Sequence, residues 1–428
     1  MKLASFALLV VLTNAAEPEG ECSNSTARWS GVEMAPADPI LGVAEAYKAD
    51  TDARKVNLGV GAYRDDAGAP WVLPSVRAAE EHVFNARLDH EYLPIAGNAE
   101  FNALSLAFAY GDASPALADG RVAVVQTLSG TGACRVAGVF LQRFSGARAI
   151  YISEPTWGNH LTIMKEAGLE VRRYRYFDAA TNGLDYAGLR EDIEAAPDGS
   201  AFLLHACAHN PTGVDPTAAQ WAELSQQLLR KRHVVFFDSA YQGFASGDAD
   251  RDAAAVRRFV ADGHELLLAQ SYAKNFGLYG ERVGALSVVC ADAAAKARVE
   301  SQLKRIARPI WSNPPAHGAR VVARVLGDAA LRAQWTAECR AMADRIIAMR
   351  DALRANLAAA GSTRDWSHIT DQIGMFAYTG LSAASVDALR ERHHIYMTRD
   401  GRMCMAALKP GDVEYVSAAM KEVLTTTE

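Results

Sequence analysis

The stretch Ser271-Tyr272-Ala273-Lys274-Asn275-Phe276-Gly277-Leu278-Tyr279-Gly280-Glu281-Arg282 places a lysine between two apolar runs, Leu266–Ala269 and Val283–Val289. Both runs are typical of buried strands. Lysines are almost never fully buried unless they are paired or chemically used. Loss of solvation at a strand end lowers the pKa of an amine and leaves it nucleophilic, as a lysine that forms a Schiff base requires. Taken alone, the stretch fits equally well a lysine in a Gly-rich turn that reaches into water.

The chain before this stretch alternates between apolar strands and helices. Strands are predicted over 121–128, 148–153, 171–177, 202–205 and 234–237, with a helix after most of them. This alternation predicts a mostly parallel sheet covered by helices on both faces, that is, an α/β fold. Polar residues stand where strands end, namely at Ser129, Asn210, Asp238, Ser271 and Lys274. Because open α/β sheets bind ligands at the carboxyl ends of their strands, we expect a phosphorylated cofactor at this edge.

The strand over 121–128 runs directly into Ser129-Gly130-Thr131-Gly132-Ala133, and a helix is predicted from there to Leu141. A helix N-terminus with small hydroxyl and glycine residues presents backbone N–H groups to an anion. A simple capped turn, which is commoner, fits the same residues.

The pattern changes after residue 290 and predicts a second, smaller α+β domain. A helix over 291–307 is expected to break at Arg308–Pro315, and a long helical region, 317–360, to break near Gly327-Asp328. Short strands (374–378, 402–406) and helices (385–393, 412–424) follow. We therefore divide the chain into a leader and linker (1–28), an N-terminal arm with part of the small domain (29–70), a large domain (71–340) and the small domain (341–428).

Composition excludes several classes of function. The chain of 428 residues has a net charge of -6 and no basic cluster interleaved with aromatic residues, so nucleic-acid binding is not expected. Its six cysteines have no metal-ligand or CxxC spacing, so we expect reduced thiols and neither a zinc site nor disulfides.

The first residues resemble a cleavable signal peptide. Lys2 precedes the apolar run Leu3–Leu12 and the small residues Thr13–Ala16, which is the pattern of a secretory leader over residues 1–16. The run is too short for a membrane anchor, and no later segment reaches about eighteen apolar residues. The triplet at Asn24 matches a glycosylation acceptor, but such triplets are common by chance.

A strand-end aspartate, a strand-end lysine and a phosphate cradle together suit one cofactor, pyridoxal 5′-phosphate. The lysine would form an imine with it, and the aspartate would keep its ring nitrogen protonated. The Gly-rich motifs of P-loop enzymes and of Rossmann dehydrogenases are both missing from the sequence.

The segment Ser271–Gly284 resembles the lysine signature of the class I pyridoxal-phosphate-dependent aminotransferases. The similarity extends over about 29–428 through matches at 57–64, 128–132, 209–213, 237–247 and 311–315. It implies the type I fold of these transferases, with a large cofactor-binding domain and a small α+β domain. It also implies a homodimer with shared active sites. The start of the body, Trp29 to Val43, resembles the mitochondrial members most.

The resemblance implies roles for the residues around the cofactor ring. Lys274 would hold the cofactor as a Schiff base and then carry the proton as general base and acid. Asp238 would pair with the ring nitrogen, and His160 would support Asp238. Tyr241 and Asn210 would hydrogen-bond the ring hydroxyl oxygen, and Trp157 would stack on the ring. Further residues would hold the phosphate: Ser129, Gly130, Thr131, Ser271, Arg282, and Tyr92 from the second subunit.

The resemblance also implies the substrate. Arg402 would clamp the α-carboxylate, Arg308 of the neighbouring subunit would clamp the side-chain carboxylate, and Gly61 would let the backbone approach the substrate. Paired arginines favour dicarboxylates. The implied reaction moves the amino group of L-aspartate to 2-oxoglutarate, giving oxaloacetate and L-glutamate. Asn210 and Trp157 would also contact the substrate.

Several alternatives stay open at this point. An aromatic or dual-specificity aminotransferase would have similar residues, and a non-catalytic binding protein could share the fold. His205 and Tyr63 could line the site or only pack. The compartment is also open, since the body is of the mitochondrial type while the leader is of the secretory type or the first part of a plastid address.

Overall fold

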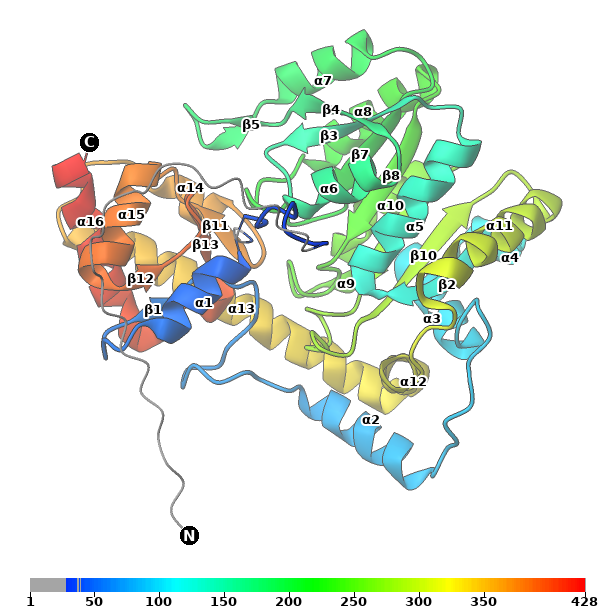
Figure 1. Cartoon of the computed structure of the whole chain (residues 1–428), viewed down its shortest axis with the longest axis horizontal. Helices are drawn as coiled ribbons and strands as arrows, with labels where there is room; N and C mark the ends of the chain where they lie inside the picture. Colours follow the sequence, from blue (N-terminus) through cyan, green and yellow to red (C-terminus); the bar gives the residue numbers. More distant parts are fainter. Residues whose placement is uncertain (1–27, 37, 39, 428) are drawn as a thin grey trace. The chain divides into compact units, whose positions relative to one another are not determined.

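The computed structural model of the chain describes residues 28–36, 38 and 40–427 (Figure 1). The predicted leader over 1–16 and the triplet at Asn24 lie outside the described residues. The chain divides into two compact units, one up to Asp38 and one from Pro39 onward. In the first unit Trp29 and Met34 are exposed, and the amide of Val32 donates to the carbonyl of Trp29.

A seven-stranded sheet forms the centre of this unit, with the strand order β2-β10-β9-β8-β7-β3-β4. The predicted α/β class with a mostly parallel sheet is confirmed, because only β10 runs against its neighbours. Its strands are β2 (Val122–Leu128), β3 (Ala149–Glu154), β4 (Glu170–Arg175), β7 (Ala201–His205), β8 (Val234–Ser239), β9 (Leu267–Ser271) and β10 (Val283–Val289).

Helices bury both faces of the sheet, as Figure 1 shows. Successive strand residues point to opposite faces, so Phe202 and Leu204 belong to one apolar cluster and Leu203 to another. One face packs against α5 (Ser129–Phe144), α6 (Asn159–Glu166) and α11 (Ala293–Trp311). The other packs against α3 (Ala99–Tyr110), α7 (Tyr186–Ala195), α8 (Ala218–Arg230) and α10 (Ala254–Ala261).

The reversed direction of β10 sets where the stretch Ser271–Arg282 lies. The chain leaves β9 at the carboxyl edge of the sheet and must re-enter the sheet at the same edge, because β10 is antiparallel to β9. Val283 pairs with Leu128, the last residue of β2. Arg282 is thereby placed beside the start of α5, although more than 150 residues separate the two in sequence.

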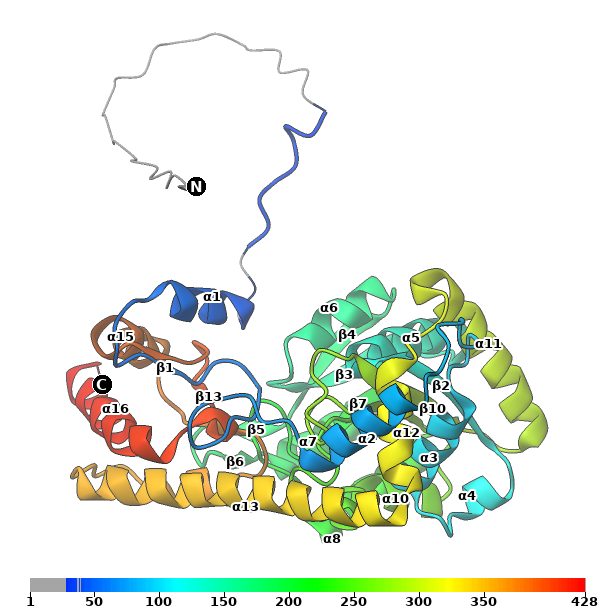
Figure 2. The same cartoon turned by 90° about the horizontal axis from the view of Figure 1, so that it is seen from below.

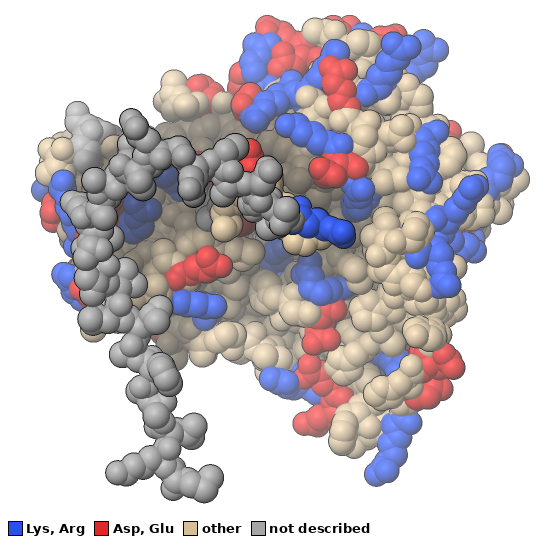
Figure 3. All heavy atoms as spheres, in the orientation of Figure 1, with Lys and Arg blue, Asp and Glu red and all other residues tan. Residues whose placement is uncertain are grey.

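The outermost strand, β4, differs from the expectation of apolar strands throughout. Its sequence Glu-Val-Arg-Arg-Tyr-Arg is largely exposed. As an edge strand it has an open row of backbone groups, and charged side chains discourage pairing with another chain there. Arg172, Arg173 and Arg175 pair with acidic neighbours, and Figure 3 shows blue and red side chains interspersed over this part of the surface.

The remaining strands form small sheets. β1 (Val56–Asn57) pairs in parallel with β12 (Ile395–Tyr396), and β11 (Phe376–Tyr378) pairs antiparallel with β13 (Arg402–Cys404). The strands β5 (Phe177–Asp178) and β6 (Gly183–Leu184) form a short hairpin. Helices α1 (Leu41–Ala49), α14 (Ser367–Asp371), α15 (Ala383–His393) and α16 (Val413–Thr427) lie near the first two of these sheets (Figure 1). The other helices are α2 (Pro74–Asn85), α4 (Pro115–Ala118), α9 (Ala249–Asp252), α12 (His317–Gly327), α13 (Ala329–Ala359) and two 3-10 turns, Met405–Ala407 and Pro410–Asp412.

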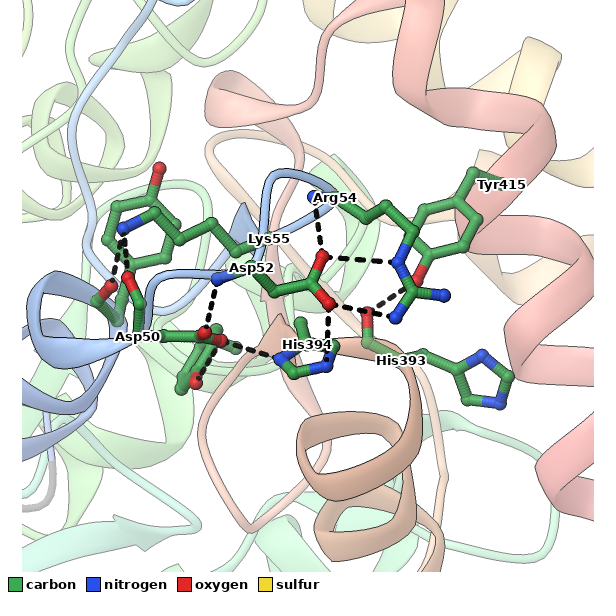
Figure 4. A network of polar contacts seen from close by, with 9 residues as sticks. Asp50, Asp52, Arg54, Lys55, His393, His394 and Tyr415 are labelled. Carbon is green, nitrogen blue, oxygen red and sulfur yellow. Dashed lines mark hydrogen bonds and ion pairs between the residues drawn. The ribbon is translucent and has the colours of Figure 1, made fainter.

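A polar network attaches the segment after α1 to β12 (Figure 4). Asp50 Oδ2 accepts hydrogen bonds from the Tyr396 hydroxyl and from Nδ1 of His394, each at 2.7 Å. Nε2 of His394 pairs with Asp52 at 3.1 Å, and Asp52 in turn binds Arg54. This network holds α1 and the segment that leads to β1 against a strand more than 340 residues away in sequence.

Two helix boundaries test the expectations for the region after residue 290. The predicted break at Gly327-Asp328 is confirmed, since Asp328 caps α13 by accepting from the amides of Ala330 and Leu331. The break expected over Arg308–Pro315 falls within that range but begins later than predicted, because α11 continues through Pro309 to Trp311. The helix ends instead at Ser312, which adopts a φ of 66°.

The long helix α13 spans the predicted boundary between large and small domains at residue 340 (Figure 2). One continuous helix therefore belongs to both sides, and this division of the chain remains a prediction. Within the described residues no helix is both long and apolar enough to cross a membrane. The five cysteines of the described residues are free and buried.

Trp335 of α13 supports the turn that carries Lys274. Its side chain is 1% exposed and stacks on Phe276 with ring centroids 4.8 Å apart. Its indole N–H donates to the carbonyl of Asn275 at 2.9 Å. The residue next to the lysine is thus held by both packing and a buried hydrogen bond.

We expect Trp335→Ala to lower the free energy of unfolding by about 3–5 kcal/mol, because it leaves a cavity and removes the stronger of two hydrogen bonds to the Asn275 carbonyl, to which the Cys339 thiol also donates. Trp335→Phe keeps an aromatic ring and should cost about 1–2 kcal/mol. Urea unfolding at fixed protein concentration measures both values. Equal losses for the two variants would contradict this account of the support.

Candidate active site

A cavity of about 260 Å³ opens at the carboxyl edge of the seven-stranded sheet. Twelve of the residues predicted for the site line it: Gly61, Ser129, Gly130, Thr131, Trp157, Asn210, Asp238, Tyr241, Ser271, Lys274, Arg282 and Arg402. Five further lining residues were not assigned a role from the sequence: Ile40, His205, Cys207, Ala240 and Phe376. The cavity therefore gathers the polar strand ends into one place.

One end of the cavity is built to hold an anion. β2 runs into α5 at Ser129, whose φ of 58° turns the chain sharply. The Ser129 and Ser271 hydroxyl oxygens lie 2.9 Å apart. Gly284 lets β10 approach this turn, because a Cβ there would lie 2.6 Å from the carbonyl carbon of Ser129. Hydroxyls, the N-terminus of a 16-residue helix and the lining guanidinium of Arg282 suit a phosphate group.

Lys274 lies in the turn after β9, and its amine faces the cavity with Nζ 5.6 Å from the ring centroid of Tyr241. Burial lowers the pKa of Lys274 below its usual value, and the carboxylate of Asp238 opposes this effect without cancelling it. A larger share of the side chain is thus the neutral, nucleophilic amine at a given pH.

Asp238, at the end of β8, presents a carboxylate to the same cavity. Burial raises its pKa, but the hydrogen bond from His160 and the positive charge of Lys274 lower it more, so the net pKa falls below the usual value. Asp238 is therefore ionised and can accept a hydrogen bond from a protonated nitrogen of a ligand. His160 itself is fully buried behind Asp238 and does not line the cavity.

A chain of hydrogen bonds determines which nitrogen of His160 carries the proton that is donated in the hydrogen bond to Asp238. The backbone amide of Asn210 donates to Nδ1 of His205 at 3.1 Å. Burial lowers the pKa of His205 to about 3, so this ring is neutral and carries its proton on Nε2. That nitrogen lies 3.3 Å from Oγ1 of Thr156, which lies 2.9 Å from Nδ1 of His160. Thr156 then donates to His160, whose Nε2 proton points at Asp238 Oδ2, 3.0 Å away.

Arg402, at the start of β13, forms the far wall of the cavity and is 4% exposed. Its Nη1 donates to Oδ1 of Asn210 at 3.3 Å and its Nη2 to the carbonyl of Gly59 at 3.0 Å. The guanidinium carbon lies 4.1 Å from the ring centroid of Phe376. Held in this way, the planar fork is suited to a carboxylate.

Gly61 stands beside Phe376 in this wall. A Cβ at residue 61 would lie 2.7 Å from Cζ of Phe376. The approach of this aromatic ring therefore explains the glycine in the structure, and an approach of substrate to the backbone stays a prediction. Tyr241 is buried, and burial raises the pKa of its phenol, so the hydroxyl keeps its proton as a donor.

Arg308 and Tyr92 do not line the cavity of their own chain. Arg308 is exposed at the end of α11 and donates to the Ser312 hydroxyl and to Oδ1 of Asn313. The amide of Asn313 donates to the carbonyl of Leu93 at 2.6 Å, next to Tyr92, which is 82% exposed. The two residues therefore sit on neighbouring exposed segments.

Sequence reasoning missed Thr156 and Phe376, and left His205 and Tyr63 open. His205 lines the cavity, whereas Tyr63 lies in the core, where its amide donates to the Tyr279 hydroxyl. Thr156 could have been found, because it is a polar residue just after a predicted strand end and four positions before His160. No local pattern pointed to Phe376, whose role depends on contacts with distant residues.

The donor set fits pyridoxal phosphate. An anion cradle, an ionised carboxylate, an amine of lowered pKa and a partly buried indole at Trp157 surround one cavity. A flat heterocycle with a phosphate, a protonated ring nitrogen and an aldehyde has a partner for each of these groups.

Comparisons with known proteins agree with this geometry. The model of the family "Aminotransferase class I and II" matches residues 53–420. The mitochondrial aspartate aminotransferase of Arabidopsis thaliana is 51% identical, covering 97% of this chain and 99% of that protein. The cytoplasmic aspartate aminotransferase of Oryza sativa subsp. japonica is 55% identical, covering 94% and 99%.

A solved structure is similar throughout. The aromatic-amino-acid aminotransferase of Burkholderia pseudomallei, covalently bound to pyridoxal phosphate, superposes with a TM-score of 0.90 and 46% identity, covering 93% of this chain and 99% of that one. With the family match over most of its length and relatives above half identity, the chain belongs to the class I and II aminotransferases.

Proposed function

We propose that this chain is an aspartate aminotransferase, which moves the amino group of L-aspartate reversibly to 2-oxoglutarate. One observation carries the proposal: the amine of Lys274, the carboxylate of Asp238 and the guanidinium of Arg402 line a single cavity. Transamination of an amino acid requires an amine that can exchange the proton of the α-carbon and a fork that binds the α-carboxylate. Relatives named aspartate aminotransferase at 51% and 55% identity support the same activity.

Pyridoxal phosphate is the cofactor, and when bound it supplies an electron sink for the bond that breaks at the substrate α-carbon. Its phosphate would be held by Ser129, Gly130, Thr131, Ser271 and Arg282. Its ring nitrogen would meet the ionised Asp238. Further contacts are assigned to the hydroxyl of Tyr241, the amide of Asn210 and the indole of Trp157, and His160 supports Asp238 from behind.

The residues of the chain divide the chemistry between them. Lys274 Nζ takes the proton from the α-carbon of the amino acid and returns it later, which its lowered pKa favours. Arg402 binds the α-carboxylate and so orients that carbon. The buried hydroxyl of Tyr241 stays protonated and donates a hydrogen bond.

A second copy of the chain completes each site in this proposal. Arg308 would bind the side-chain carboxylate of the substrate in the neighbouring subunit, and Tyr92 would reach the neighbour's phosphate. Both residues are exposed and lie outside the cavity of their own chain, which supports action in a homodimer. Exposed apolar side chains close to them in sequence, Phe84, Leu88 and Ile310, support the same assembly.

An aromatic aminotransferase is the second candidate, because the structurally similar Burkholderia enzyme is named an aromatic-amino-acid aminotransferase. Arg308 favours dicarboxylates, but it does not exclude acceptance of both classes.

The compartment of the protein remains a prediction. The relatives named above include a mitochondrial and a cytoplasmic enzyme, so they do not determine the compartment, and the prediction depends on the leader over 1–16. Imaging a tagged full-length chain would locate the protein.

We expect Lys274→Ala to reduce aspartate transamination by more than about 10⁴-fold, since it removes the proton carrier and the nucleophile together. The substitution Lys296→Ala, at a lysine of α11 that pairs with Glu300, serves as the control and should retain full activity. Coupled-enzyme assays of oxaloacetate measure both. Wild-type rates in Lys274→Ala would exclude the proposal.

Substrate choice should depend on Arg308. We expect Arg308→Ala to lower kcat/KM for aspartate by about 10²–10³-fold, because a charged pair is lost, and to change kcat/KM for phenylalanine much less. Arg305→Ala, at an exposed arginine one turn earlier on α11, should affect neither substrate. An unchanged value for aspartate would show that Arg308 is not the distal clamp.

Hybrid dimers test whether Arg308 acts across subunits. Lys274→Ala and Arg308→Ala are each impaired, but a dimer with one copy of each has one site with both residues intact. After random exchange of subunits, activity should therefore recover to about a quarter of the wild-type value. Mixing the Lys274→Ala/Arg308→Ala double variant with Lys274→Ala is the control and should recover nothing. If the single variants also recover nothing on mixing, Arg308 does not act in the neighbouring site.

A further inference from the structure

Arg350, in the middle of α13, is a buried cation with no carboxylate among its hydrogen-bond partners. Its side chain is 2% exposed. No ion pair joins it to an acidic residue within the described part of the chain. Burial lowers its pKa to about 9, which leaves the guanidinium charged at neutral pH. A charge in such a place costs stability unless its hydrogen bonds are satisfied.

Backbone carbonyls of one short segment satisfy this cation. Nη1 donates to the carbonyl of Ile369 at 2.8 Å, while Nη2 donates to those of Gly374 and Phe376 at 2.9 and 2.5 Å. Ile369 lies in the short helix α14, Gly374 in the connection that follows it, and Phe376 at the start of β11. The guanidinium thus joins a one-turn helix, an irregular connection and a three-residue strand, and it supplies donors that longer regular elements would otherwise provide.

The last of these carbonyls belongs to the residue that faces Arg402. The Phe376 ring lines the cavity, and its centroid lies 4.1 Å from the guanidinium carbon of Arg402. Behind it the ring meets Gly61, where there is no room for a Cβ. Phe376 is therefore confined between the backbone at residue 61 and the Arg402 guanidinium, and a shift of its backbone would move the ring against one of them.

We propose that Arg350 is a positioning residue for carboxylate recognition: it fixes the backbone of Phe376, and the Phe376 ring fixes the guanidinium of Arg402. The inference rests on the proposed function, in which Arg402 binds the α-carboxylate. A planar fork is needed because one side chain must reach three carbonyls in different directions, which the single nitrogen of a lysine cannot do equally well. Arg350 does not line the cavity, so its effect passes through the aromatic ring.

The test measures binding and not turnover. Succinate has two carboxylates and cannot be transaminated, and its dissociation constant can be measured by calorimetry on the holoenzyme. We expect Phe376→Leu to raise this constant about tenfold, because the cation–π contact is lost. Arg350→Met should raise it to a similar extent. Because both changes act on one contact, the double variant should be no weaker than the weaker single variant.

Arg354→Met is the matched control. Arg354 lies on the same helix, one turn further on, and donates to the Thr370 hydroxyl from an exposed position. The same substitution there should leave the succinate constant unchanged. The residues proposed to hold the cofactor include neither Phe376 nor Arg350, so its dissociation constant should stay at the wild-type value in all of these variants. Loss of cofactor and succinate affinity together would indicate general damage and would overturn the inference.

A dissociation constant for succinate equal to that of the wild type in folded Arg350→Met would overturn the inference. Fully additive effects in the double variant would overturn it as well. Arg350→Lys keeps the charge but has fewer donors, and it should raise the constant by a smaller factor. If neither variant at 350 folds, hydrogen exchange on the unaltered holoenzyme applies: succinate should slow exchange over 369–378, and no slowing would overturn the inference. Failure of the wild type to transaminate aspartate would instead count against the proposed function.

Discussion

The direction of one strand places the chemistry of this protein. Because β10 runs antiparallel to β9 and β2, the chain that leaves β9 at Ser271 must return to the same edge of the sheet by Val283. The turn between them has to stay at that edge, where β2, β7 and β8 also end. Lys274 and Arg282 thus reach Ser129 and Asp238 without any long loop, and packing of Trp335 against Phe276 holds the turn. The cavity exists because this turn closes one of its sides.

Three cations next to this cavity are stabilised in different ways, and the differences match their roles. Burial lowers the pKa of Lys274 in spite of Asp238, which favours an amine that can exchange protons. Arg402 stays charged and keeps part of its fork free for a ligand, since protein acceptors take only a few of its donors. Arg350 donates to three backbone carbonyls and stabilises the segment that carries them. Asp238, ionised through His160, balances this positive charge.

Local patterns predicted the sheet, its covering helices and the polar strand ends of the cavity, while the resemblance to a family supplied Gly61, Trp157, Tyr241, Arg282 and Arg402. A strand followed by Ser129-Gly130-Thr131, or a lysine between two apolar runs, is visible in a short window. Features that depend on distant contacts were not predictable in this way. The helix α11 continues through Pro309 because the surrounding structure outweighs the local preference to stop. Phe376 and Arg350 matter through partners from other elements. The resemblance to a family was also needed for Arg308 and Tyr92, which lie outside the cavity of their own chain.

The central claim is that Lys274 bonds covalently to the cofactor at this edge of the sheet. Borohydride reduction of the purified holoenzyme, followed by proteolysis and mass spectrometry, tests it most directly. The account predicts a stable cofactor adduct on the peptide that contains Lys274 and on no other lysine peptide. An adduct on a different lysine, or no adduct in a protein that holds stoichiometric cofactor, would contradict it.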